Sequence, residues 1–233
     1  MTTPPAAAVL PQAVFWDMDG TLVDTEPYWL SAESALVGAH GGVWTEADGL
    51  QLVGSSLEGS ALVLQSRGVD LPVQEIIDVL TDHVLEHIAR EVPWRPGARE
   101  LLSGLRELGV PTALVTMSIG RMAAAVIDAL GFEAFDAVVT GDQVAAGKPD
   151  PECYLHAAAL LDVDPARSVA IEDSEYGVAA AVAAGMATVA VPLHVDLPES
   201  PRYALWRGLV GRTPADLAAV LAARTAARSG EPA

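Results

Sequence analysis

Ala13-Val14-Phe15-Trp16-Asp17-Met18-Asp19-Gly20-Thr21, near the start of the chain, is the stretch that decides the fold. Its first four residues are apolar, which predicts a short buried strand. The strand ends at Asp17, and a second carboxylate comes directly afterwards at Asp19. Paired aspartates also occur in ordinary turns and helix caps, so their role depends on the residues at the ends of the other strands.

Beyond Gly97, short apolar runs alternate with segments of helical pattern. We expect strands at 13–16, 112–115, 137–139, 169–171 and 188–191, and helices at 98–108, 122–130, 152–161, 176–184 and from 213 onward. Strands that alternate with helices indicate right-handed crossover units. The predicted fold class is therefore α/β with a parallel sheet.

Residues 25–92 show helical periodicity and no strand alternation. Because this block comes directly after the first strand, we expect an inserted all-helical domain with proline-containing hinges at 24–27 and 92–96. The core domain would comprise residues 1–24 and 93–233, and the tails 1–11 and 225–233 are expected to be frayed.

The formal net charge is −18, from 13 basic and 31 acidic residues. Nucleic acid is a poor partner for such a surface, because phosphate contacts need clustered Lys and Arg. A phosphorylated small molecule would bind only where a metal or a few well-placed cations supply positive charge. Lys148 is the only lysine, and it is a candidate for a position that needs a compact ammonium group.

Cellular location is constrained by hydropathy and by cysteine content. No apolar run approaches the roughly 20 residues that cross a bilayer, so no membrane partner is expected. Residues 1–12 contain no Lys or Arg and lack the charged start of a signal peptide. Cys153 is the only cysteine, which fits a reducing compartment and a structural role. We expect a cytoplasmic monomer.

Polar segments lie after each of the first four predicted strands, and the carboxyl ends of parallel strands are where ligands bind. Three of their aspartates, Asp17, Asp19 and Asp173, would repel one another unless a divalent cation lay between them. Hard oxygen ligands suit Mg²⁺. The sequence therefore predicts a magnesium site at this edge of the sheet.

The remaining polar residues of these segments suit a phosphoryl group. Lys148 adds a second positive charge, and Thr116 and Ser118 add hydroxyl donors. A carboxylate inside such an anion site can attack phosphorus in line and form an aspartyl-phosphate. Each segment alone is an ordinary loop or cap, but their occurrence at successive strand ends indicates phosphoryl transfer.

The four segments resemble the four motifs of the haloacid dehalogenase (HAD) superfamily: Asp17 to Thr21, Thr116, Lys148 within Gly-Lys-Pro, and Glu172-Asp173. The match covers the whole chain apart from the tails. The resemblance implies a Rossmann-like core, and it makes the helical insert the small cap domain of this superfamily.

The resemblance also implies roles for individual residues. Asp17 would be the nucleophile, and Asp19 would protonate the leaving oxygen and later activate water. Thr116 and Lys148 would hold the phosphoryl group. The implied Mg²⁺ ligands are the Asp17 carboxylate, the Asp19 backbone carbonyl and Asp173, with Glu172 as a further candidate.

Within the superfamily, single residues separate the activities. Dehalogenases do not keep the second aspartate, which is present here as Asp19, and phosphonate-cleaving members need a cap lysine that is absent. A mutase of the β-phosphoglucomutase type is the alternative, but Trp29 and Leu57 stand where its histidine and arginine would be. The segment from Asp17 through Pro27 to Trp29 more closely resembles sugar-phosphate phosphatases, such as 2-deoxyglucose-6-phosphatase.

We therefore expect a Mg²⁺-dependent phosphatase of a small phosphorylated metabolite, with a sugar phosphate as the favoured substrate. The cap would close over the site and exclude water. The expected substrate contacts are Gly20, Glu26, the 54–56 turn, Met117 and Ser118.

A second motif points to a different class of enzyme. His83-Val84-Leu85-Glu86-His87 fits the H-x-x-E-H pattern of inverted zinc peptidases, in which two histidines on one helix face bind zinc. No third ligand is evident, and a parallel sheet is the wrong context. A non-catalytic phosphometabolite-binding module is the other alternative, although every catalytic position is filled.

Overall fold

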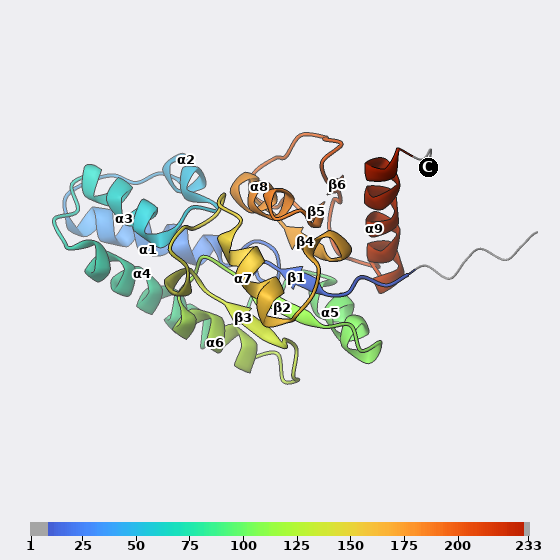
Figure 1. The fold of residues 1–233 in the computed structure, drawn as a ribbon. Coiled ribbons are helices and arrows are strands. Elements are labelled where there is room, and N and C mark those ends of the chain that lie inside the picture. The colour runs from blue at the N-terminus through green and yellow to red at the C-terminus, as the bar shows by residue number, and fades with distance from the viewer. Residues whose placement is uncertain (1–8, 231–233) are drawn as a thin grey trace, which may run out of the picture.

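A parallel sheet lies between two layers of helices in the computed structural model, which describes residues 9–230 (Figure 1). Its strands are β1 (Val14–Trp16), β2 (Thr112–Val115), β3 (Ala137–Val139), β4 (Val169–Glu172), β5 (Ala187–Ala190) and β6 (Ala204–Leu205). Their order in the sheet is β3-β2-β1-β4-β5-β6. The predicted parallel α/β fold is confirmed, and β6 is a short edge strand that the sequence did not reveal.

The apolar run at β1 is continuous because both faces of this central strand are covered. Phe15 packs on one side with residues of α7 (Glu152–Leu160) and α8 (Glu175–Ala183). Val14 and Trp16 pack on the other side with α5 (Ala98–Glu107), α6 (Gly120–Asp128) and α9 (Pro214–Ser229). The pairing of Trp16 with both Leu114 and Ile171 aligns the carboxyl ends of β1, β2 and β4.

Between β1 and α5, the chain forms a separate layer of helices that projects from the sheet (Figure 1). These are α1 (Glu26–Ala39), α2 (Glu46–Gly49), the 3₁₀ turn η1 (Leu50–Leu52), α3 (Leu57–Ser66) and α4 (Val73–Ile88). Helix α4 packs against both α1 and α3, and it buries Ile76, Leu80 and Val84. The inserted all-helical cap of the predicted fold class is therefore present between β1 and α5.

The two chain segments that join the cap to the core run side by side. The Asp24 N–H donates to the Pro93 carbonyl at 2.8 Å, and the Arg95 N–H donates to the Leu22 carbonyl at 3.0 Å. Val23 and Trp94 form an antiparallel bridge between them. These hydrogen bonds make a short two-stranded link directly after the Asp17–Thr21 loop, which ties the base of the cap to that loop.

The ordered chain extends further at both ends than the sequence predicted. Leu10 packs against the core, and α9 continues to Ser229, so the expected fraying is wrong for Leu10 and for 225–229. Helix α9 persists because Leu217 and Leu221 are buried against the sheet and Thr213 caps its first turn. The rest of the tail prediction, 1–8 and 231–233, lies outside the described residues. Within 9–230, no helix is long and apolar enough to span a membrane.

Candidate active site

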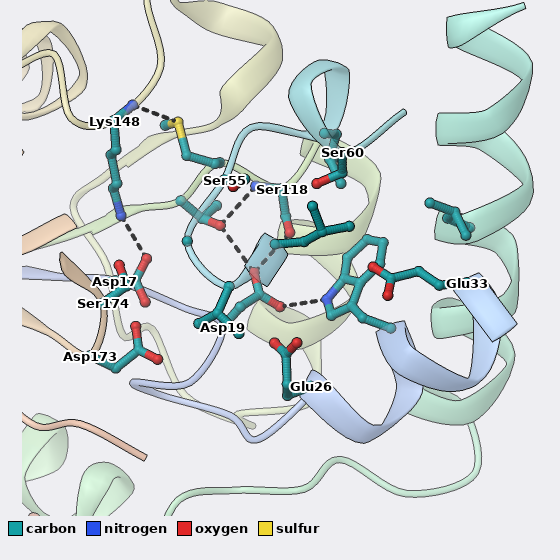
Figure 2. A pocket seen from close by; sticks show the side chains of 18 residues that line it. Asp17, Asp19, Glu26, Glu33, Ser55, Ser60, Ser118, Lys148, Asp173 and Ser174 are labelled. Carbon is teal, nitrogen blue, oxygen red and sulfur yellow. Dashed lines mark hydrogen bonds and ion pairs between the residues drawn. The ribbon is translucent and has the colours of Figure 1, made fainter. Parts of the chain in front are cut away.

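Lys148 and Asp17 form the centre of a site at the carboxyl edge of the sheet (Figure 2). The Lys148 Nζ lies 2.6 Å from Asp17 Oδ1 and 2.7 Å from Glu172 Oε1, and it donates to the Val115 carbonyl at 3.0 Å. Burial alone would lower the pKa of Lys148, but the two adjacent carboxylates raise it above its ordinary value. The ammonium group is therefore charged and fixed at the ends of β1, β2 and β4.

Asp17, Glu172 and Asp173 form an acidic cluster in which one carboxylate oxygen from each lies within 4.8 Å of the others. Burial, followed by the charge of Glu172, raises the pKa of Asp17 to about 7. Burial and the charge of Asp17 raise the pKa of Asp173 as well. Without a cation, this cluster disfavours ionisation of its own carboxyl groups.

The donor set fits a hard divalent cation. Asp17 Oδ2 is buried and has no hydrogen-bond partner among the described residues. Together with Asp173 it presents oxygen ligands, which Mg²⁺ prefers. Glu172 Oε2 also lacks a hydrogen-bond partner among the described residues, but this side chain is fully buried, does not line the cavity and directs Oε1 to Lys148 and the Tyr154 hydroxyl. Its geometry suits orienting Lys148 better than direct metal ligation.

The loop after Asp17 requires glycine at position 20. A Cβ at this position would lie 1.9 Å from Asp173 Oδ2, and the backbone has φ of +80°. The Gly20 carbonyl accepts a hydrogen bond from Arg95, a buried residue that also donates to the Val191 carbonyl at 2.6 Å. Gly20 does not line the cavity, so its role is to let the loop pass closely over Asp173.

Asp19 points away from the Lys148 ammonium, toward the base of the cap (Figure 2). Its Oδ1 accepts hydrogen bonds from Thr25 Oγ1 and from Trp29 Nε1, the latter at 3.3 Å. Its Oδ2 accepts from Ser118 Oγ at 2.8 Å and from Thr116 Oγ1 at 3.3 Å. The two aspartates of the motif therefore have different partners and can perform different chemistry.

The cavity beside these aspartates is closed on its other side by the cap. Of the expected substrate contacts, Glu26, Met117, Ser118 and the turn residues Gly54 and Ser55 line this cavity, whereas Ser56 caps α3 instead, accepting from the Gly59 N–H at 3.1 Å. A Cβ at Gly54 would lie 2.6 Å from Ser174 Oγ, which shows how closely this turn approaches the core.

Two carboxyl groups on α1 face the cavity from the cap (Figure 2). Burial, followed by the charges of Glu33 and Asp19, raises the pKa of Glu26 to about 8. Burial raises the pKa of Glu33 to about 7, although Trp44 Nε1 donates to it at 2.9 Å. Sequence analysis missed Glu33, yet its position two helical turns after Glu26 places both on one face of α1.

The alternative zinc site is not assembled. His87 stacks on the Tyr28 ring with centroids 4.7 Å apart, and His83 Nε2 lies 3.2 Å from Ser31 Oγ. Both imidazoles therefore contact α1. Across the part of the chain that the structure describes, the acidic cluster is the one group with three potential metal ligands. Cys153 is buried with a pKa raised to about 11 by burial, which supports a structural role.

Comparisons with known proteins give a consistent result. The family model described as haloacid dehalogenase-like hydrolase matches residues 11–185. A phosphorylated carbohydrates phosphatase of Thermotoga maritima is 33% identical over 189 residues, covering 78% of this chain and 86% of that protein. Hexitol phosphatase A of Escherichia coli is 34% identical over 188 residues, covering 78% and 84%.

A solved structure extends the comparison to the arrangement of the elements. CbbY from Rhodobacter sphaeroides, in complex with xylulose-1,5-bisphosphate, superposes with a TM-score of 0.80 at 27% identity. The match covers 87% of this chain and 96% of that one. The fold and the cap are therefore shared with a protein whose structure holds a phosphorylated sugar.

Proposed function

Because this chain belongs to the haloacid dehalogenase-like hydrolases, we propose that it is a Mg²⁺-dependent phosphatase of a small phosphorylated carbohydrate. The observation that carries this proposal is that the two aspartates of the site, Asp17 and Asp19, have different hydrogen-bond and ion-pair partners. Asp17 is paired with Lys148 at 2.6 Å and keeps one carboxylate oxygen without a partner, whereas Asp19 is held by hydroxyl and indole donors.

In the first half-reaction, one carboxylate oxygen of Asp17 attacks phosphorus, the other being the one that would hold the cation, and the bond from phosphorus to the leaving-group oxygen breaks. Asp19 supplies the proton that this oxygen needs. The Thr116 and Ser118 hydroxyls, which now donate to Asp19, turn to the phosphoryl oxygens. Lys148 stabilises the charge that develops on them. The product is an alcohol and an aspartyl-phosphate at Asp17.

In the second half-reaction, Asp19 accepts a proton from water, which attacks the phosphorus of the aspartyl-phosphate. The bond between phosphorus and Asp17 breaks, and inorganic phosphate leaves. A bound Mg²⁺, held by Asp17, the Asp19 carbonyl and Asp173, would neutralise charge on the phosphoryl group. Glu172 and Tyr154 keep the Lys148 ammonium in position from behind.

The charge of the cavity supports a substrate with a neutral leaving group. Among the described residues, Lys148 is the one cation in its lining, and Asp17 and Glu172 already engage it. The cap side contributes Glu26 and Glu33, which suit the hydroxyl groups of a sugar or polyol. A second phosphate would meet no arginine or lysine there, and this also argues against the mutase, which binds a bisphosphate intermediate.

Phosphate release from a panel of sugar and polyol monophosphates tests the proposal. We expect turnover that requires Mg²⁺ and disappears in Asp17→Asn, while thermal unfolding shows that this variant is folded. No Mg²⁺-dependent release from any member, including an aryl phosphate, would contradict the proposal. The monomeric state and the cytoplasmic location stay predictions from the sequence.

A further inference from the structure

Positive charge is concentrated on one side of this acidic protein. Helix α9 lies at the end of the molecule away from the cap (Figure 1). Three hollows adjoin α9, two of them with the segment after β5 and one with residues 166–167, and each contains arginine. They hold half of the 12 arginines in a chain of net charge −18: Arg167, Arg202, Arg207, Arg212, Arg224 and Arg228.

The largest of these hollows, here called the arginine groove, has a volume of about 660 Å³ and is lined by Arg202, Arg212, Arg224 and Arg228. This volume is in the range of about 300–1,000 Å³ that small-molecule sites occupy. Trp206 and Tyr203 also line the groove, and Val220 and Ala223 of α9 add an apolar wall. The groove thus combines cations with flat and apolar surface.

The four guanidinium groups of the groove have no ion-pair partner among residues 9–230. Among the described residues, one carboxylate, Asp216, lines the groove; Thr213 engages it through its backbone N–H and its hydroxyl, both at 2.8 Å, and the nearby charge of Arg212 helps to lower its pKa without forming an ion pair. Arginine remains charged at all physiological pH values, so the four groups repel one another. An anion in the groove would relieve this repulsion.

Two details indicate where an anionic group, and the rest of the molecule that bears it, would lie in the groove. Arg224 Nε is buried and has no hydrogen-bond partner within the described chain, which leaves a donor unsatisfied at the wall of the groove. The Arg212 guanidinium stacks over the Trp206 ring at 4.3 Å, which presents a planar cationic face. Guanidinium groups match phosphate oxygens in bidentate geometry, and their planes stack on aromatic rings.

We propose that the arginine groove binds a small molecule that carries both a phosphate group and a flat ring, as a nucleoside phosphate does. Arg224 and Arg202 contact the phosphate, and Arg212 with Trp206 contacts the ring. The groove lies apart from the acidic cluster and shares no lining residue with the catalytic cavity. A nucleic acid polymer is not the ligand, because the rest of the acidic surface repels it.

Isothermal titration of the full-length protein in EDTA tests this site, with AMP as the probe and with adenosine and inorganic phosphate as its two halves. EDTA removes the cation that an anion needs in the catalytic site. We expect AMP to bind at one equivalent and each half to bind at least tenfold more weakly. Arg224→Gln and Arg212→Gln should each weaken AMP binding about tenfold or more, since each removes a charged hydrogen-bond donor.

Arg90→Gln is the matched control, because Arg90 is exposed on the cap and lines none of the described hollows. It should bind AMP as the unmodified protein does, and all three variants should unfold at the same temperature. Absence of AMP binding, or equal binding by the groove variants, would overturn the proposal. So would adenosine or phosphate binding as tightly as AMP. If a hexaglutamate peptide bound more tightly than AMP, the small-molecule proposal would be wrong and the ligand of the groove would be an acidic protein surface.

Discussion

The acidic cluster should make the stability of the metal-free protein fall as pH rises. Asp17 has a pKa of about 7 in the folded protein, against an ordinary value of 3.8. Between these two values the unfolded chain binds fewer protons than the folded chain, so the free energy of unfolding decreases with increasing pH. The stabilising contribution is complete below about pH 4 and is lost above about pH 7.

The size of this effect can be worked from the shift. About three pKa units correspond to roughly 4 kcal/mol for Asp17 alone. For a chain of this length, each kcal/mol changes Tm by about 2–4 °C, so we expect Asp17 to lower Tm by about 8–16 °C from acid to neutral pH in EDTA. Bound Mg²⁺ favours the ionised carboxylates, so it should remove most of this loss and stabilise the protein more at neutral than at acid pH.

Thermal unfolding monitored by circular dichroism, in EDTA and in excess Mg²⁺ across this pH range, provides the assay. Glu26 and Glu33 also have raised pKa values, so the comparison with Asp17→Asn isolates the cluster. In EDTA, Tm of the unmodified protein should fall with pH more steeply than Tm of Asp17→Asn. Parallel pH profiles for the two proteins, or a Mg²⁺ effect that is largest at acid pH, would refute the reasoning.

Three further predictions concern turnover. Lys148→Met should lower kcat about 10²–10³-fold in steady-state assays, because it removes one preorganised cation from the phosphoryl group; near-normal kcat would exclude that role. Above about pH 8, where Glu33 is ionised, kcat/KM for sugars that differ only by a second phosphate should be at least about tenfold lower for the bisphosphate, because a like-charge contact at about 6 Å costs roughly 3 kcal/mol. Glu33→Gln should narrow this ratio and Glu58→Gln, on the exposed cap surface, should not; equal ratios in both variants would contradict a role for Glu33. Gly20→Ala should cost at least about 1 kcal/mol in urea unfolding and weaken Mg²⁺ activation, because its Cβ would overlap Asp173; unchanged activation would refute this.

Much of the core was predictable because each strand has a clear local signature. The run 13–16 is apolar throughout since helices cover both faces of β1, and the later strands alternate with helices at regular intervals. Strand β6 escaped prediction because it contains two residues, Ala204 and Leu205, at the edge of the sheet. The end of α9 was misjudged because the apolar stripe that anchors this helix ends at Leu221, well before the last helical residue.

The candidate site likewise contains residues that the sequence predicts and residues that it does not. Asp17 and Asp173 come directly after β1 and β4, which pair in parallel, so their strand ends meet. Lys148 follows the edge strand β3, and the segment after that strand returns it to Asp17 and the Val115 carbonyl. Glu33 and Arg95 were not predicted. The spacing from Glu26 places Glu33 on the same face of α1, but that this face meets the cavity depends on how the cap packs on the core. The position of Arg95 depends on the direction of the hinge, and such long-range packing leaves no local pattern in the sequence.

The central claim is that Asp17 becomes covalently phosphorylated, and peptide mass spectrometry after rapid acid quenching tests it most directly. Asp19→Asn, which keeps the nucleophile but cannot activate water, should be mixed with Mg²⁺ and an excess of an activated aryl phosphate. We expect a phosphoryl group on the peptide that contains Asp17, and none on the same peptide of Asp17→Asn. If the unmodified enzyme released phosphate but no phosphorylated Asp17 were found, even in Asp19→Asn, Asp17 would not be the nucleophile.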